Sequence, residues 1–358
     1  MLLQCRCKQN ARRLAGVFFL AGIFSLLSGC AFIIPQTEEL RTAWPAGLPD
    51  RAEITAVPFF AQDDYQCGPA ALATSLAHFK VPVTPDDLVS KVYLPARQGS
   101  LQIEMLAATR PYGLVSYQLP PRFEAMLREV ASGTPVIVLQ DYGVWPVSLW
   151  HYAVVAGYDR DKGELLLRSG TKPRLQIPFS VFEYTWKESG YWAMVTMPPE
   201  RIPVTALEAP YLEAVTAMER AAPPDAARRA YAAFLARWPG NLAAGIGLAN
   251  RHYAAGDLAA AEAALRQTAA KHPDAVAVVN NLAHTLSDQG RNQEALELIE
   301  PIVERAGAFA ADVRDTRNTI LTRLGRALEL KAVQGIAVPG VADPGGGGAA
   351  AGAPPAPR

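Results

Sequence analysis

Cysteine and histidine are scarce in this chain, with four cysteines and five histidines among 358 residues. An excess of charge of either sign is also lacking, because 34 basic side chains balance 34 acidic ones. A neutral chain gives no electrostatic reason to expect nucleic-acid binding. The histidines are scattered and no cysteine pair has zinc-ligand spacing. We therefore expect no metal and no other cofactor.

Two further motifs are missing. No stretch reads Gly-x-x-x-x-Gly-Lys followed by Ser or Thr, so the chain lacks the phosphate-binding loop of ATPases. The apolar run over residues 14–27 is shorter than the about 20 residues that a comfortable transmembrane helix needs. Its basic start and small residues are typical of a signal peptide.

The sequence Leu-Ser-Gly-Cys at 27–30 ends this segment and resembles the lipobox of bacterial lipoproteins. The resemblance implies that residues 1–29 are removed and that Cys30 carries lipid. Ala31, in place of Asp, implies release to the outer membrane, facing the periplasm. An ordinary signal peptide or a short anchor helix is the alternative interpretation.

Cys67 would then be the one free thiol of the mature chain, because Cys5 and Cys7 leave with the signal peptide. It has no partner for an internal disulfide. A lone cysteine is most often a small buried hydrophobic residue. Its surroundings must decide whether it is reactive.

The pattern along the chain predicts several segments. Residues 30–52 are proline-containing and weakly periodic, and we interpret them as a tether. Helices are expected first, over 67–79, 84 onward, 100–108 and 122–131, with Thr84 as N-cap and Pro85 in the first turn. Strands follow over 135–140, 151–158, 164–168 and 191–196. This order predicts an α+β domain over 53–199.

Alanine-rich helices with a 34-residue period occupy 205–335. Pro239 and Pro273 are 34 residues apart, and so are Gly256 and Gly290. Small residues recur at Ala227, Ala261 and Ala295. The pattern resembles the tetratricopeptide repeat, with about three units over 207–308, Pro301 inside the last helix and a capping helix over 312–330. A generic array of helical hairpins is the alternative, and both are all-α solenoids. Residues 336–358 are a Gly/Ala/Pro tail that we expect to be disordered.

Cys67 begins a predicted helix, and Pro69 fits its first turn. The free backbone N–H groups there favour the thiolate, which is the nucleophilic form. Gln62 lies five residues upstream, where its amide can donate to a developing oxyanion.

His151 is the candidate base, because it starts an apolar strand. His78 lies about 16 Å along the helix from Cys67, and His252, His272 and His284 fall in the repeat region. A half-buried structural histidine is the alternative interpretation of His151.

Gln62, Cys-Gly-Pro-Ala at 67–70 and His-Tyr-Ala-Val-Val at 151–155 together resemble the bacteriocin-processing, double-glycine-leader cysteine peptidases of the papain-like clan. The resemblance covers about residues 55–199. It implies a papain-like fold, Cys67 as nucleophile, His151 as base and then acid, and Gln62 as oxyanion donor. The family's glutamine usually lies six residues before the cysteine.

The family also expects an Asp that orients the histidine, and its position falls near Ser169. Strand register puts Asp159 near a turn, on the order of 25 Å from His151. A serine accepts a hydrogen bond from imidazole but supplies no charge. Either Cys67 and His151 act as a dyad, or another residue orients His151.

The sequence thus predicts a lipid-anchored envelope cysteine peptidase that hydrolyses peptide bonds through a Cys67 thioester. The repeats would recruit a protein partner or the substrate. A catalytically silent domain with a repeat adaptor is the main alternative, and acyl transfer to an amine is a third. The residues at 145–150 before His151 can wall a substrate groove or serve as core.

Overall fold

The computed structural model describes residues 34–61, 66–97, 99–144 and 146–326. The chain divides into two compact units, Met1–Asp257 and Leu258–Arg358. Each unit is described by itself. Among the residues described, no helix combines the length and the apolar character that crossing a membrane requires.

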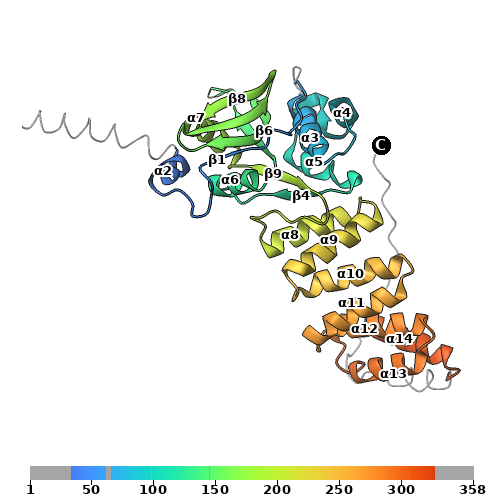
Figure 1. Ribbon diagram of the computed structural model, residues 1–358. Helices are drawn as coiled ribbons and strands as arrows, with labels where there is room; N and C mark the ends of the chain where they lie inside the picture. Colours follow the sequence, from blue (N-terminus) through green and yellow to red (C-terminus); the bar gives the residue numbers. More distant parts are fainter. Residues whose placement is uncertain (1–33, 62–65, 98, 145, 327–358) are drawn as a thin grey trace, which may run out of the picture. The chain divides into compact units, whose positions relative to one another are not determined.

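The first unit is built on one antiparallel sheet with the strand order β4-β9-β5-β6-β7-β8 (Figure 1). A further strand, β1, pairs with the end of β6. The strands are β1 Arg51–Glu53, β4 Val115–Gln118, β5 Val136–Asp141, β6 Trp150–Asp159, β7 Glu164–Ser169, β8 Lys172–Pro178 and β9 Ala193–Met197. A separate two-stranded ribbon joins β2 Tyr93–Leu94 to β3 Gly99–Ser100. The helix-then-sheet layout confirms the predicted α+β class.

Both faces of the sheet are covered, because the central strands are apolar on both sides. Ile137 and Tyr152 pack with helices α3 Cys67–His78, α4 Pro85–Val92 and α5 Gln102–Ala107. Val138 and Ala153 face the opposite core. That core also contains α6 Phe123–Ala131, α7 Phe179–Trp186, α8 Glu208–Glu219 and α9 Pro224–Arg237. Alternate residues of one strand therefore serve two separate cores.

Gly68 allows α3 to approach the β2–β3 ribbon closely. A Cβ at this position would lie 2.2 Å from Ser100 Oγ, so any larger residue would push the ribbon away. Thr84 donates both its backbone N–H and its hydroxyl to Asp87 at 2.8 Å, which fixes the start of α4 as predicted. Gly68 thus determines where the first turn of α3 lies, and Thr84 where α4 begins.

The N-terminal segment differs from the tether that the sequence predicted. Residues Pro35–Thr42 form helix α2. Its first N–H groups, those of Gln36 and Thr37, donate to the buried carboxylate of Glu183 at 2.9 and 2.5 Å. The Gln36 side chain also accepts from the backbone N–H of Phe123. A short helix without its own hydrophobic periodicity is stable here because a distant carboxylate caps it.

Helices with the predicted repeat spacing follow in the described residues. They are α10 Leu242–Ala254 in the first unit, and α11 Leu258–Lys271, α12 Val276–Asp288, α13 Asn292–Ile299 and α14 Ala310–Arg323 in the second. Gly256 and Gly290 follow α10 and α12 with φ of +77° and +83°. Ala227, Ala261 and Ala295 are fully buried. The helix containing Pro301 is shorter than predicted, because α13 gives way to a 3₁₀ turn at Glu300–Ile302.

Candidate active site

Cys67 is the first residue of α3 and is partly buried. The backbone N–H groups of Tyr152, Gly68 and Cys67 itself lie near the thiol and favour the thiolate. Burial acts against them and is the larger effect, so the pKa of the Cys67 thiol is raised. The expectation that the helix start favours the thiolate is therefore only partly met, because desolvation outweighs the donors.

The contact with Tyr152 brings Cys67 to the start of β6, where His151 is the preceding residue. His151 is half-buried, and burial lowers the pKa of its imidazole to about 4. The two candidate catalytic residues, 84 positions apart in sequence, are thus joined through one strand end. Near neutral pH the free site holds a thiol and a neutral imidazole.

Ser169, at the end of β7, lies beside His151. Its Oγ is 2.8 Å from His151 Nε2. Asp159 pairs with Glu164 at the other end of the two strands, and its carboxylate lies 3.2 Å from Arg51. The register therefore agrees with the sequence argument, since Asp159 is remote from His151 and a hydroxyl stands at the orienting position.

A group of three further residues lies behind His151 and was not predicted from the sequence: Tyr142, Gln140 and Thr185. The Tyr142 ring stacks on the imidazole with centroids 5.1 Å apart and planes 24° apart. Its hydroxyl donates to Gln140 Oε1 at 3.1 Å. Gln140 Nε2 donates to Thr185 Oγ1 at 2.7 Å. The sequence indicates this group only through Gln140, a polar residue at the end of a predicted apolar strand.

The loop between β5 and β6 carries an apolar rim next to His151. Asp141 Oδ1 accepts from the N–H groups of Gly143 and Leu149 at 2.8 and 2.7 Å, which closes the loop. The exposed fractions of the rim residues are 82% for Val144, 70% for Val147, 60% for Leu149 and 47% for Trp150. An apolar rim at a candidate active site favours contact with apolar groups of a ligand.

The other sequence candidates lie elsewhere. Gln62 falls outside the described residues, so its predicted role stays a prediction. His78 is at the far end of α3, with Nε2 3.2 Å from the carbonyl of Gly133. His252 and His284 belong to α10 and α12, and His272 follows α11. Within the described part of the chain, no three His, Cys, Asp or Glu side chains cluster as metal ligands would.

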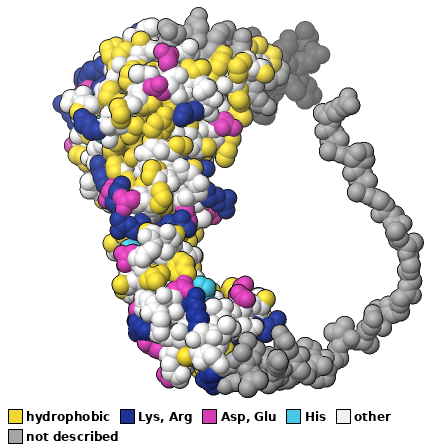
Figure 2. All heavy atoms as spheres, turned by 90° about the vertical axis from the view of Figure 1, so that its right-hand side faces the viewer, with side chains coloured by type: hydrophobic (Ala, Val, Ile, Leu, Met, Phe, Trp, Pro, Cys, Tyr) yellow, Lys and Arg dark blue, Asp and Glu magenta, His cyan; other side chains and the backbone are white. Residues whose placement is uncertain are grey.

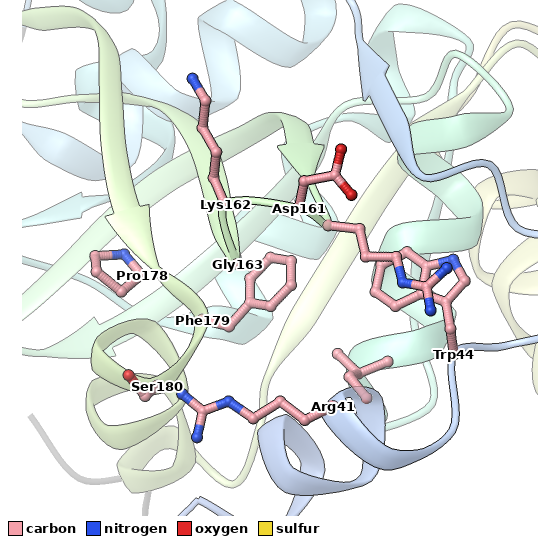
Figure 3. A pocket seen from close by; sticks show the side chains of 10 residues that line it. Arg41, Trp44, Asp161, Lys162, Gly163, Pro178, Phe179 and Ser180 are labelled. Carbon is pink, nitrogen blue, oxygen red and sulfur yellow. The ribbon is translucent and has the colours of Figure 1, made fainter.

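The coloured residues on the face drawn in Figure 2 form no patch of a single charge. On the face drawn in Figure 2, Lys and Arg side chains are interspersed with Asp and Glu. A cavity of about 370 Å³ lies between α2, the β6–β7 turn and the start of α7, and Figure 3 shows its lining. It contains Arg41, Trp44 and Phe179 but no residue of the Cys67 site.

Two family models match parts of the chain. Residues 54–194 match the model of the Peptidase C39-like family, and residues 252–315 match the tetratricopeptide repeat. The chain therefore has a segment similar to the C39-like family, followed by a segment similar to tetratricopeptide repeats. The predicted family resemblance and the predicted fold class are therefore confirmed. No curated protein matches the chain.

Two solved structures are similar to the C39-like part. One is a protein of Bacillus anthracis described as a C39-like peptidase, with 17% identity over 42% of this chain and 98% of that one, at a TM-score of 0.36. The other is a double glycine motif protease from an AMS/PCAT transporter in complex with the leader peptide. It shows 21% identity over 41% of this chain and 94% of that one, at a TM-score of 0.32.

The neutral state of His151 can be tested by titration. Burial lowers the pKa of the imidazole from about 6.5 in the unfolded chain to about 4. As the pH falls, His151 therefore takes up a proton in the unfolded chain before it does so in the folded chain. The contribution of His151 to the free energy of unfolding is complete above pH 6.5 and is lost as the pH falls toward 4. The loss amounts to about 3 kcal/mol of unfolding free energy.

The measurement is a proton NMR titration of the His151 ring, together with urea unfolding at pH 7 and pH 4.5. The matched variant is His151→Gln, whose amide can still donate to Ser169 but does not titrate. Its unfolding free energy should fall less over this range than that of the wild type. A midpoint above pH 6.5 would contradict a neutral imidazole.

Proposed function

We propose that the C39-like domain is a cysteine peptidase that hydrolyses peptide bonds, with Cys67 as nucleophile and His151 as general base. One observation carries this proposal. Cys67, at the start of α3, packs against the cluster that contains Tyr152, the residue that follows His151. The Ser169 hydroxyl holds His151 from the other side. The proposed nucleophile, base and orienting group thus lie together where the start of α3 meets the start of β6 and the end of β7.

The reaction follows from these positions. Nε2 of His151 is engaged by Ser169, so Nδ1 is the nitrogen left to accept the thiol proton. The sulfur attacks the peptide carbonyl as that proton leaves, and negative charge develops on the carbonyl oxygen. The side chain of Gln62 is the proposed donor to this oxyanion. The imidazolium then protonates the leaving amine, and a thioester remains.

Hydrolysis reverses these roles. His151 takes a proton from water, which attacks the thioester carbonyl. The sulfur leaves, recovers the proton, and the carboxylic acid product departs. A neutral thiol on Cys67 and a neutral imidazole on His151 suit this order of steps, because the proton moves only when a substrate is present. The helix-start donors stabilise the thiolate at the moment it forms.

A catalytically silent binding module is the second candidate. The observation that favours it is the hydroxyl of Ser169, which stands where a carboxylate would stabilise imidazolium by charge. In both cases the tetratricopeptide repeats supply a protein-interaction surface, which we propose recruits the substrate or a partner protein.

The reactivity of Cys67 separates the two candidates. In His151→Ala we expect the rate of iodoacetamide labelling of Cys67 at pH 7 to fall about 100-fold, because a positioned general base is lost. Hydrolysis of a mixed peptide library, followed by mass spectrometry, should be abolished in Cys67→Ala. His284→Ala, at an exposed position on α12, is the matched control. A labelling rate at pH 7 that is the same in His151→Ala as in the wild type would exclude the peptidase.

We further propose that the apolar rim binds apolar side chains of the peptide substrate. Val147→Ser should raise KM for cleaved peptides about tenfold and leave kcat nearly unchanged, since burying a valine contributes about 1.5 kcal/mol. Val204→Ser is the control, because Val204 is 50% exposed and lies outside this loop. Equal effects of both substitutions on KM would contradict a role for the rim.

We propose that the protein is anchored through lipid on Cys30, at the outer membrane and facing the periplasm. Residues 31–34 alone separate Cys30 from α2, a reach of at most about 17 Å. The capping of α2 by Glu183 would therefore hold the peptidase domain close to the bilayer.

This anchor predicts the distribution of the protein between cell fractions. Expressed in a Gram-negative host, the full chain should partition with membranes, and Cys30→Ser should move to the soluble periplasmic fraction. Cys67→Ser should stay with the membranes, which controls for loss of a cysteine. Membrane retention of Cys30→Ser would contradict lipid anchoring and favour an anchor helix.

A further inference from the structure

We propose that Tyr142 is a positioning residue, whose ring stacks on the His151 imidazole and fixes the plane of that ring for proton transfer. Gln140 and Thr185 hold Tyr142 in this place from the side of α7. The catalytic consequence rests on the proposed peptidase function, whereas the restraint on the imidazole does not. All three residues act through His151, which alone handles the reacting proton.

The pairing of β5 with β6 explains why the two rings meet. Gln140 lies directly opposite His151 in this pair, and the backbone N–H of Tyr142 donates to the carbonyl of Leu149 at 2.9 Å. Tyr142 is therefore a diagonal neighbour of His151 on the same face of the sheet. Diagonal neighbours are about 7–8 Å apart, a gap that an aromatic side chain can span.

The stack restrains the imidazole in a way that a hydrogen bond by itself does not. Ser169 Oγ lies 2.8 Å from His151 Nε2, and a bond to one ring atom lets the ring tilt about that atom. The Tyr142 ring covers one face of the imidazole, with centroids 5.1 Å apart and planes 24° apart. This separation is typical of offset stacking between aromatic rings. One contact fixes an atom and the other fixes the plane, so Nδ1 keeps one direction.

Gln140 holds the Tyr142 side chain in place. Its own side chain is fully buried, so both of its polar atoms require partners. Its Oε1 accepts from the Tyr142 hydroxyl at 3.1 Å, and its Nε2 donates to Thr185 Oγ1 at 2.7 Å. The amide thus connects the residue that follows β5 to helix α7.

Thr185 fixes which way the Gln140 amide is turned. Its Oγ1 lies 2.9 Å from the carbonyl of Phe182 and 3.3 Å from that of Val181. Carbonyl oxygens only accept, so the Thr185 hydroxyl donates to the helix backbone and accepts from Gln140. The amide nitrogen therefore faces Thr185, and the amide oxygen faces Tyr142. The Tyr142 hydroxyl donates to that oxygen, which keeps the ring against His151.

The restraint acts on the step that the proposed peptidase needs. In that step Nδ1 of His151 accepts the proton of the Cys67 thiol, so the imidazole must keep one orientation toward the sulfur. A ring that is free to tilt would spend part of its time unable to react. Tyr142, Gln140 and Thr185 are uncharged, so they orient the imidazole without changing the charge of the site. This role also explains a fully buried glutamine in an apolar strand.

The decisive experiment is proton NMR of the His151 ring in the full chain at pH 7, with the signals assigned by comparison with His151→Gln. A stacked tyrosine shields the imidazole protons, so we expect their signals upfield of those of an exposed histidine. Tyr142→Leu removes the aromatic ring and should abolish this shift, whereas Tyr142→Phe keeps the ring and should preserve it. Tyr184→Leu, at a position 55% exposed on α7, is the control and should match the wild type.

The rate of iodoacetamide labelling of Cys67 at pH 7 is the second readout. Tyr142→Leu should lower it about tenfold, because the base loses its orientation. Tyr142→Phe and Thr185→Val each break one hydrogen bond behind the ring and should lower it about threefold. The double variant should label no more slowly than either single one, because both act through Gln140. These two shape-preserving variants also cover the case that Tyr142→Leu fails to fold.

His151 signals at the same position in the wild type and in Tyr142→Leu would overturn the positioning role of Tyr142. Additive losses of labelling rate in Tyr142→Phe and Thr185→Val would overturn the part that Gln140 and Thr185 have in it. If Tyr142→Leu abolishes the upfield shift but the wild type cleaves no peptide, the restraint on His151 stands and the peptidase proposal fails.

Discussion

The site depends on the contact between the first turn of α3 and the start of β6. Gly68 lets the helix approach Ser100, and Cys67 then packs against the cluster that contains Tyr152. This one contact joins the cysteine helix to the strand that carries His151. Because β6 also pairs with β5 and β7, it sets the places of Gln140 and Ser169. A shift of the helix would separate the nucleophile from every other group.

Burial then decides the chemistry that this arrangement favours. Desolvation disfavours both charged forms, so it raises the pKa of Cys67 and lowers that of His151. When Cys67 and His151 are both neutral, the position of the imidazole matters more than a neighbouring charge, since the proton must move along one defined path during the reaction. A hydroxyl at Ser169 suits a neutral imidazole, which requires an acceptor for one N–H. A hydroxyl at this position is thus compatible with the other described residues of the site.

The N-terminal segment shows where sequence patterns stop being informative. Residues 30–52 have little periodicity and were predicted to be a tether, yet Pro35–Thr42 form a helix. The helix is stabilised by Glu183, which lies 147 residues from Gln36. The same limit applies to Thr185, which belongs to a helix that the sequence analysis did not predict. Nothing near either residue in sequence indicates its partner.

The sequence by itself determined the order of the domains, the cysteine at a helix start, the histidine at a strand start and the helical repeat. These features depend on spacing between near neighbours, such as the 34 residues between Gly256 and Gly290. Only the tertiary structure decided which group holds His151 and how far Cys67 is desolvated. Both depend on segments far apart in sequence that share one buried volume, where solvent exclusion and cross-strand register act together.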